Sequence, residues 1–282
     1  MVWYKRFLDI FEKPIESISS EIIENISAKV KSVQCDDPVV SVIIIAHNEE
    51  TRLLSCVWSL AENITEFPFE IIGVDNNSDD STLSLFKRLG VKSYSEERKG
   101  PGYARQKGLD MARGEYCLCI DSDTLYPPSY IQKMVLALRK TNVVVVSSTY
   151  NYVPDKNFPR FWMGIYEFVR DIHLFFLSFK NPVWCVRGAV MGHKTLLARE
   201  VGGYREYLMR GEDGALAYDM SQFGKIVFIR GYKARAYTST KALSADGHIL
   251  RAFYNRFIDS LKGFRRYLFF TGDSDPRPSD NK

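Results

Sequence analysis

The sequence has few cysteines, and none of them has the spacing of a metal-binding or redox pair. Its 282 residues contain five cysteines, and no Cys-x-x-Cys occurs among them. A disulfide framework and a structural zinc site are therefore not expected, and a reducing, cytoplasmic compartment is the default. Cys117 and Cys119 alternate within an apolar run, which is typical of a buried strand.

Long uncharged apolar runs are also absent from the sequence. The first ten residues carry three charges, and no uncharged core of a signal peptide follows them. The most apolar stretch, 161–179, is interrupted by Glu167, Arg170, Asp171 and His173, so it falls short of the roughly 20 apolar residues that cross a bilayer. These features predict a soluble protein or one that lies peripherally on a membrane.

A large excess of either charge is missing too. The chain has 38 Lys and Arg against 34 Asp and Glu, which gives a formal net charge of +4. This balance argues against a nucleic-acid partner, because nucleic-acid-binding domains carry a concentrated basic stripe. It suits a protein that handles a modest number of phosphates. Hydrophobic residues at 45% indicate an ordinary globular chain of one large domain or two small ones.

Three regions of different character follow one another along the chain. Residues 1–37 are predicted to form an N-terminal helical extension, since isoleucines recur there at spacings of three and four. The main domain is predicted over 38–240, in two halves at 38–148 and 149–240. A C-terminal helix and a mobile tail rich in Asp, Pro and Ser are predicted for 241–282.

Strands and helices alternate through the first half of the main domain. The β-branched run 39–45 has no polar face, which is typical of a strand buried on both sides in a parallel sheet. Further strands are predicted at 69–74, 91–93, 115–120 and 143–147, and helices at 50–63, 81–89, 103–112 and 129–140. This order predicts an α/β fold with a Rossmann-like, mostly parallel central sheet flanked by helices.

The second half of the main domain is less regular. Predicted elements are a helical, aromatic-rich region at 150–185, a strand at 184–191, helices at 194–201 and 216–223, a strand at 225–229 and a terminal helix at 249–269. The aromatic residues of 158–179 and the basic terminal helix allow two interpretations. They form a core stripe with a solvated opposite face, or they place the protein on the inner membrane surface beside a polyprenyl-linked acceptor.

Polar and acidic residues follow three of the predicted strands. Ala46-His47-Asn48-Glu49 follows the first, a segment beginning at Asp75 follows the second, and Asp121-Ser122-Asp123 follows the fourth. Ligands of open α/β sheets bind beyond the carboxyl ends of the strands. These clusters are therefore expected to converge on one ligand site.

The two carboxylates of Asp121 and Asp123 point to a divalent cation. Carboxylates this close together repel each other unless a cation or strong hydrogen-bond donors compensate. Mg²⁺ typically takes one or two carboxylates together with substrate phosphates. The alternative interpretation is a turn followed by a helix N-cap, because Asp and Ser favour such positions.

Two further segments have chemistry suited to a nucleotide. Asp75 can accept hydrogen bonds from a uracil or ribose edge. The segment 99–108 has the character of a phosphate-binding element, because Gly100 and Gly102 allow a ligand close to the backbone and Arg105 follows on a helix. A plain loop with solvated basic residues is the alternative.

Taken in order, these segments resemble the nucleotide-sugar half of a family 2 glycosyltransferase. The resemblance rests on 42–50, 74–82, 100–108 and 112–116 leading to Asp121-Ser122-Asp123. The segments 188–196 and 201–206 resemble the acceptor side of that family, and Gly211-Glu212-Asp213 resembles its Glu-Asp motif at a helix start. The resemblance covers roughly 39–240.

The resemblance implies a GT-A fold and an inverting, metal-dependent glycosyltransferase of surface polysaccharide biosynthesis. The donor would be a nucleoside diphosphate sugar, a UDP-sugar by default, the cofactor Mn²⁺ or Mg²⁺, and the acceptor a glycan or a lipid-linked sugar. Asp213 would be the catalytic base and Asp121 and Asp123 the metal ligands. The implied substrate-binding residues are Ala46, Asn48, Glu49, Asp75, Asn77, Gly102, Arg105, Asp121, Trp184, Arg187, Gly188 and Glu212.

Some of these roles have alternatives in the sequence. Glu212 competes with Asp213 as the base, although two neighbours on a helix project about 100° apart, so only one of them is expected to face the sugar. Trp184 and Arg187 either line the acceptor groove or serve as a packed Trp and a solvated Arg. His248 is a candidate third metal ligand, whereas His47, His173 and His193 are expected to be structural.

Three other functions are weighed against this one. A sugar nucleotidyltransferase would have a Gly-rich signature with a Lys near the first strand, which Ala46-His47-Asn48-Glu49 lacks. A nucleotide-sugar-binding protein without transferase activity would keep Asp75 but would not need Asp213. A metal phosphohydrolase would use Asp121 and Asp123 without any acceptor.

Overall fold

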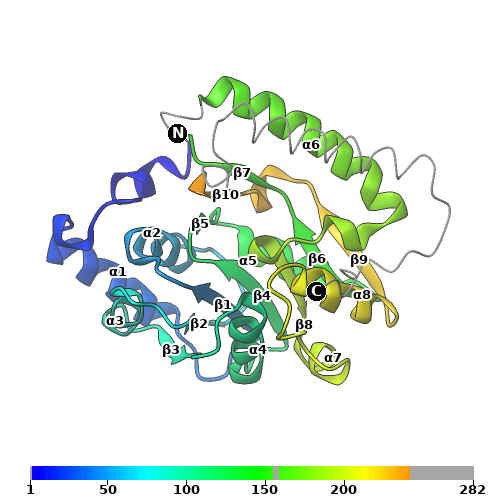
Figure 1. Cartoon of the computed structure of the whole chain (residues 1–282), viewed down its shortest axis with the longest axis horizontal. Helices are drawn as coiled ribbons and strands as arrows, with labels where there is room; N and C mark the ends of the chain where they lie inside the picture. The colour runs from blue at the N-terminus through cyan, green and yellow to red at the C-terminus, as the bar shows by residue number, and fades with distance from the viewer. Residues whose placement is uncertain (1, 155–158, 242–282) are drawn as a thin grey trace.

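The computed structural model describes residues 2–154 and 159–241, which form a central sheet with helices on both faces (Figure 1). The strands of this sheet are β3 (Lys92–Ser95), β2 (Phe69–Asp75), β1 (Val40–Ala46), β4 (Tyr116–Asp121), β8 (Met191–Lys194), β6 (Val143–Ser148) and β9 (Lys225–Ile229), in that spatial order. Only β8 runs antiparallel to its neighbours, β4 and β6. The prediction of a mostly parallel α/β sheet is confirmed.

Two apolar cores lie on opposite faces of the sheet. Helices α1 (Ser20–Val33), α2 (Glu50–Ala61), α3 (Thr82–Arg88) and α5 (Tyr130–Leu138) contribute to one core. The helices α4 (Pro101–Met111), α7 (Thr195–Glu200) and α8 (Glu212–Ser221) contribute to the other. The strand β1 is buried on both faces because Val42 and Ile44 face the first core and Ile43 faces the second.

The register of the parallel strands brings three chain segments together at one edge. Ala46 at the end of β1 lies opposite Asp75 at the end of β2, and Ile45 lies opposite Asp121 at the end of β4. Consecutive parallel strands end at the same edge of a sheet, so the loops that follow them must meet there. The convergence expected from the sequence is therefore a direct consequence of strand register.

A small second sheet adjoins this edge. It consists of β5 (Thr124–Leu125), β10 (Ala236–Thr238) and β7 (Tyr150–Tyr152), with β10 in the middle. The longest helix of the described residues, α6 (Arg160–Lys180), follows β7 along the outside of the molecule (Figure 1). None of the helices in the described ranges is both long enough and apolar enough to cross a membrane.

The N-terminal region contains three helical pieces: two short 3-10 helices, η1 (Lys5–Asp9) and η2 (Ile15–Ser17), precede α1, and Pro14 stands between them. The structure corrects two of the local predictions. The strand predicted over 184–191 is wrong. That segment forms the 3-10 helices η3 (Pro182–Cys185) and η4 (Gly188–Val190), held by local hydrogen bonds, and β8 begins only at Met191.

The second correction concerns the aromatic residues of 158–179. A core stripe was the alternative to a membrane-facing surface, and for most of these aromatic side chains it is wrong. Phe161, Phe168 and Phe179 are 67–70% exposed, and the buried side chains of α6 are Met163, Glu167, Arg170 and Leu174. The terminal helix predicted at 249–269 and the tail lie outside the described residues, as does His248.

Candidate active site

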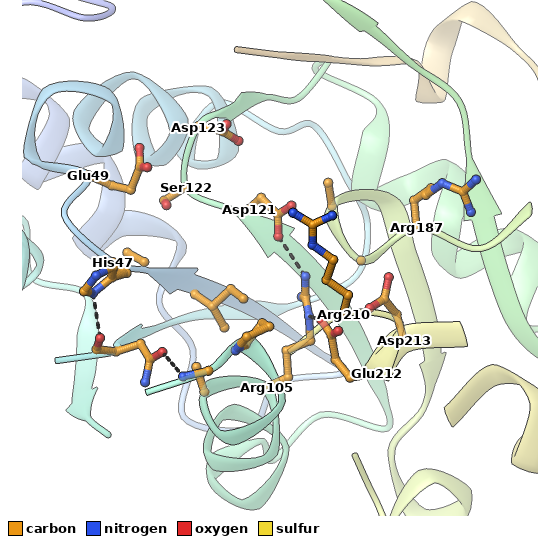
Figure 2. A pocket seen from close by; sticks show the side chains of 18 of the residues that line it. His47, Glu49, Arg105, Asp121, Ser122, Asp123, Arg187, Arg210, Glu212 and Asp213 are labelled. Atoms are coloured by element: carbon orange, nitrogen blue, oxygen red, sulfur yellow. Dashed lines mark hydrogen bonds and ion pairs between the residues drawn. The ribbon is translucent and has the colours of Figure 1, made fainter. Parts of the chain in front are cut away.

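A cleft of about 720 Å³ opens at the carboxyl ends of β1 and β4. Its walls come from six parts of the chain: the loops after β1, β2 and β4, the start of α4, the small sheet, and the segment 187–213. The acidic side chains on these walls are Glu49, Asp121, Asp123, Glu212 and Asp213. Figure 2 shows Glu49, Ser122 and Asp123 along one side, with Arg187, Arg210 and Asp213 along the other.

The loop after β1 contributes Ala46 and Glu49 to the cleft, as expected, but not Asn48. The backbone N–H of Asn48 donates to Ser78 Oγ at 2.9 Å, and its side-chain oxygen accepts from the N–H of Asp79 at 2.9 Å. Asn48 therefore ties two loops together and is not among the residues that line the cleft. His47 was expected to be structural, and its Nδ1 does lie 2.9 Å from the Asn76 carbonyl oxygen (Figure 2). His47 also lines the cleft, which was not expected.

Asp75, which was expected to bind substrate, is not among the residues that line the cleft. It is 2% exposed, and one carboxylate oxygen, Oδ2, accepts from the N–H of Ser78 at 3.2 Å. The other, Oδ1, is buried without a hydrogen-bond partner in the described structure. A buried carboxylate oxygen without a donor is costly, so this atom is suited to accept a hydrogen bond from a ligand. Asn77, with a φ of 57°, is not among the cleft-lining residues.

Asn76 is the residue of this loop that does reach the cleft. Its amide nitrogen donates to the carbonyls of Glu96 and Arg98, and its oxygen accepts from the N–H of Gly100 at 2.9 Å. Asn76 thereby fixes the position of the loop that leads into α4. Asn76 was not among the site residues expected from the sequence, so its role was missed.

The N-terminus of α4 points its first turn at the cleft. Gly100 has a φ of 143°, a conformation that favours glycine, and Gly100 and Pro101 both line the cleft. The free N–H groups of a helix start favour an anion such as a diphosphate. Gly102 has a different role from the one expected. A Cβ there would lie 2.8 Å from the carbonyl oxygens of Arg205 and Glu206, so Gly102 allows close packing of α4 and does not line the cleft.

Asp123 is an acid without a cationic partner among its hydrogen bonds. Its Oδ1 accepts from the hydroxyls of Thr124 at 3.0 Å and Thr238 at 3.3 Å. Burial, followed by repulsion from Asp121 and Glu49, raises the pKa of Asp123 to about 7. The pKa of Asp121 is also raised, by burial and by the charge of Asp213, although Arg105 opposes this. A cation placed between the two aspartates would relieve both effects.

The donor set fits a divalent metal that shares its ligands with a substrate. No group of three or more His, Cys, Asp or Glu side chains in the described ranges is arranged to hold a metal ion. Mg²⁺ and similar ions are typically bound by one or two carboxylates together with substrate phosphates. Two aspartates separated by one residue, next to a helix start that suits phosphate, match this pattern. Asp121 and Asp123 are the residues that would hold the metal, with phosphate oxygens completing its coordination.

Arg105 lies at the floor of the cleft and is buried. Its Nη2 lies 2.8 Å from Asp121 Oδ1 and its Nε lies 3.0 Å from Glu212 Oε1 (Figure 2). The third nitrogen, Nη1, is buried and has no hydrogen-bond partner among the residues that the structure describes. Gly188 makes room for this arrangement: a Cβ there would lie 2.1 Å from Arg105 Nη2 and 3.1 Å from Asp213 Oδ2.

Glu212 and Asp213 both line the cleft, and the expectation that only one of them faces the sugar stays a prediction. Both sit in the first turn of α8, after Gly211, which has a φ of 83°. Glu212 is buried and paired with Arg105, and burial and the Asp213 charge raise its pKa to about 7. Within the described ranges Asp213 forms no such ion pair, and it is the more accessible of the two acids.

The acceptor side differs from the expectation in one residue. Arg187 and Gly188 line the cleft, but Trp184 does not, because it lies on η3 with 43% of its surface exposed. Several lining residues were missed by the sequence reasoning: Lys99, Tyr150, Tyr152, Met209, Arg210, Thr238 and Ser239. Tyr150, Tyr152 and Thr238 belong to the small sheet, which the sequence reasoning did not predict.

The comparisons with known proteins agree with this architecture. Residues 41–199 match the model of the family described as "Glycosyl transferase family 2". EpsH of Bacillus subtilis, which carries the name of a glycosyltransferase, is 33% identical over 105 residues, 36% of this chain and 30% of that protein. The alignments span 30–51% of the first three curated relatives, so the chain matches at most about half of their length.

Two solved structures show the same fold at low sequence identity. TarS of S. aureus in complex with UDP-GlcNAc is 22% identical, with a TM-score of 0.55 over 71% of this chain and 58% of that one. The mannosyltransferase PcManGT from Pyrobaculum calidifontis, in complex with GDP-Man and Mn²⁺, is 18% identical, with a TM-score of 0.57 over 85% and 72%. Because the family match covers more than half of the chain, the protein belongs to glycosyl transferase family 2.

Proposed function

We propose that this protein is an inverting glycosyltransferase that moves a sugar from a nucleoside diphosphate sugar to a hydroxyl of a glycan or glycolipid. One observation carries the proposal: Asp121 and Asp123 from the end of β4 and Asp213 from the start of α8 line a single cleft. Family membership supports the reaction class, and the UDP-GlcNAc and GDP-Man complexes of the two structural relatives support the class of donor.

Asp75, Asn76 and the start of α4 would bind the donor. Asp75 Oδ1 would accept a hydrogen bond from the base or ribose, and the first turn of α4 would face the diphosphate. A UDP-sugar is the default donor. Asp121 and Asp123 would hold Mn²⁺ or Mg²⁺, which when bound neutralises charge on the diphosphate leaving group.

Asp213 would act as the general base. An acceptor hydroxyl is a poor nucleophile until a carboxylate takes its proton, and general-base help is worth about 10²–10⁴-fold. Attack from the side opposite the diphosphate would invert the anomeric configuration. Glu212 is the weaker candidate because Arg105 already holds its carboxylate and because it is 4% exposed.

The location expected from the sequence is kept in this proposal. All five cysteines are free thiols, which fits a reducing cytoplasmic compartment. A glycan or lipid-linked acceptor of surface polysaccharide biosynthesis is the acceptor class that we favour.

The test separates a transferase from a protein that only binds nucleotide sugars. We expect a UDP- or GDP-sugar with Mn²⁺ to raise the melting temperature of the full chain, and Asp123→Ala to abolish the Mn²⁺-dependent part of the rise. We expect Asp213→Asn to retain the donor-induced shift but to lower transfer, and donor hydrolysis in the absence of acceptor, by about 10²–10⁴-fold. Unchanged turnover in Asp213→Asn, or release of free phosphate, would refute the proposal.

A further inference from the structure

The helix α6 has the reverse of the usual arrangement for a surface helix. Its buried stripe, Met163, Glu167, Arg170 and Leu174, contains two charged residues. The opposite side carries a continuous apolar stripe at helical spacing, and all of these side chains are at least 40% exposed: Phe161, Trp162, Ile165, Phe168, Ile172, Phe175, Phe176 and Phe179. Exposed apolar surface of this extent marks an interaction site.

Polar contacts on the inner side lock α6 in this orientation. The Glu167 carboxylate accepts from the N–H of Tyr152 at 2.8 Å and pairs with Arg160 at 2.9 Å. The Arg170 guanidinium donates to the carbonyl of Tyr150 at 2.5 Å and pairs with Asp171 at 2.8 Å. Rolling the helix to bury its aromatic residues would break the hydrogen bonds of Glu167 to Tyr152 and of Arg170 to Tyr150, so the outward stripe is a fixed feature of the fold.

Cationic side chains border the apolar stripe, and the acids of α6 are neutralised. Arg230 lies over the rings of Phe175 and Phe179, at 4.2 and 5.1 Å from their centroids. Arg160 and Lys180 stand at the two ends of the helix. Both acids of α6 are paired with arginines, Glu167 with Arg160, and Asp171 with Arg170 and Arg235. The border is therefore positively charged.

A groove of about 470 Å³ opens beside this stripe. Its lining is apolar apart from Thr149, Asp171, Arg230 and Arg235, and the apolar residues include Phe168, Ile172, Phe176 and Phe228. An apolar groove with arginines at its edge matches the chemistry of an anionic phospholipid, whose acyl chain is apolar and whose headgroup is a phosphate.

We propose that the stripe of α6 docks the protein on an anionic bilayer, with its aromatic residues in the headgroup region and the bordering arginines on lipid phosphates. A helix with Trp and Phe on one side and cations beside them lies in the plane of a membrane interface. A second copy of the chain fits less well, because a two-fold contact would bring each cationic border against its own copy. This inference stands apart from the proposed reaction.

Vesicle sedimentation with the full chain tests the proposal. We expect the protein to bind vesicles of phosphatidylcholine and phosphatidylglycerol, and added salt to weaken the binding. Phe168→Ser with Phe179→Ser should weaken binding about tenfold or more, since two largely exposed aromatic rings are lost from the interface. The matched control is Leu196→Ser with Phe223→Ser, because these side chains are also 65–69% exposed but lie on other elements. This control should bind as the unmodified protein does.

A second measurement reports insertion directly. Trp162 on α6 should be quenched by brominated lipids in the vesicles, and Trp162→Phe should remove that component of quenching. The proposal is overturned if the protein stays in the supernatant, if the control pair weakens binding equally, or if the stripe variant changes only the oligomeric state. A circular dichroism melt of each variant confirms that the fold is retained.

Discussion

Arg105 and Asp121 form an ion pair at the floor of the cleft, with 2.8 Å between Nη2 and Oδ1. The same guanidinium holds Glu212 at 3.0 Å, so one buried cation joins the end of β4 to the start of α8. Arg105 therefore holds both Asp121, the proposed metal ligand, and Glu212, the neighbour of the proposed base. Arg105 also lines the cleft, so its expected contact with substrate phosphate stays a prediction beside this structural role.

Replacing Arg105 should destabilise the protein strongly. Arg105→Met leaves Asp121, Glu212 and Asp213 facing one another without their shared cation. Breaking a buried ion pair on one side costs about 3–5 kcal/mol, and we expect a loss of that size in urea unfolding. Arg105→Lys should lose less, because a charge remains. A loss below about 1 kcal/mol in Arg105→Met would contradict the supporting role.

Gly188→Ala should damage the site, whereas Gly214→Ala should not. The new methyl at Gly188 would collide with Arg105 Nη2 at 2.1 Å and crowd Asp213 Oδ2 at 3.1 Å. Gly214 follows Asp213 in α8, and a Cβ there would meet no atom within 4 Å. We expect Gly188→Ala to lower kcat about tenfold or more, since even small misplacement of reacting groups is costly. Equal activity of both variants would contradict the prediction that the site needs a glycine at position 188.

Asn76→Asp should weaken donor binding without affecting the metal ligands. The Asn76 amide donates to two carbonyls, from Glu96 and Arg98, and a carboxylate can donate to neither. Leaving these buried acceptors unpaired costs about 1–3 kcal/mol, and the loop that leads to Gly100 should loosen. We expect a higher KM for the nucleotide sugar with little change in kcat. A variant with unchanged KM and stability would show that Asn76 does not order this loop.

The stability of the protein should fall in mild acid because of His193. This side chain is fully buried, and burial lowers its pKa from 6.5 to about 4. Between these two pH values the unfolded chain binds a proton that the folded chain does not, so unfolding becomes easier as pH falls. The contribution amounts to roughly 3 kcal/mol at pH 4 relative to pH 7.

The measurement compares two pH profiles of the unfolding free energy. His193→Asn should be less stable at pH 7, because the contact of His193 with the Tyr204 hydroxyl is lost. It should nevertheless lose less stability than the unmodified protein between pH 6.5 and pH 4.5. Parallel profiles across that interval would mean that His193 is protonated in the folded state.

Local sequence patterns were sufficient for the fold and for part of the site. The uniformly apolar run of β1 and the strand-helix alternation fix a parallel sheet, because such strands must be covered on both faces. Parallel strands end at one edge, so the approach of Asp121 to the loop after β1 followed from the order of elements alone.

Tertiary structure decided which side chains of those motifs reach the cleft and which way α6 faces. Asn48 and Gly102 belong to the motifs but serve loop and helix packing, whereas Asn76 and Arg210 reach the cleft. The period of α6 showed two faces, but periodicity does not tell which face is inside. Hydrogen bonds from Glu167 and Arg170 to β7 settle that choice, and those contacts exist only once α6 has packed against the small sheet.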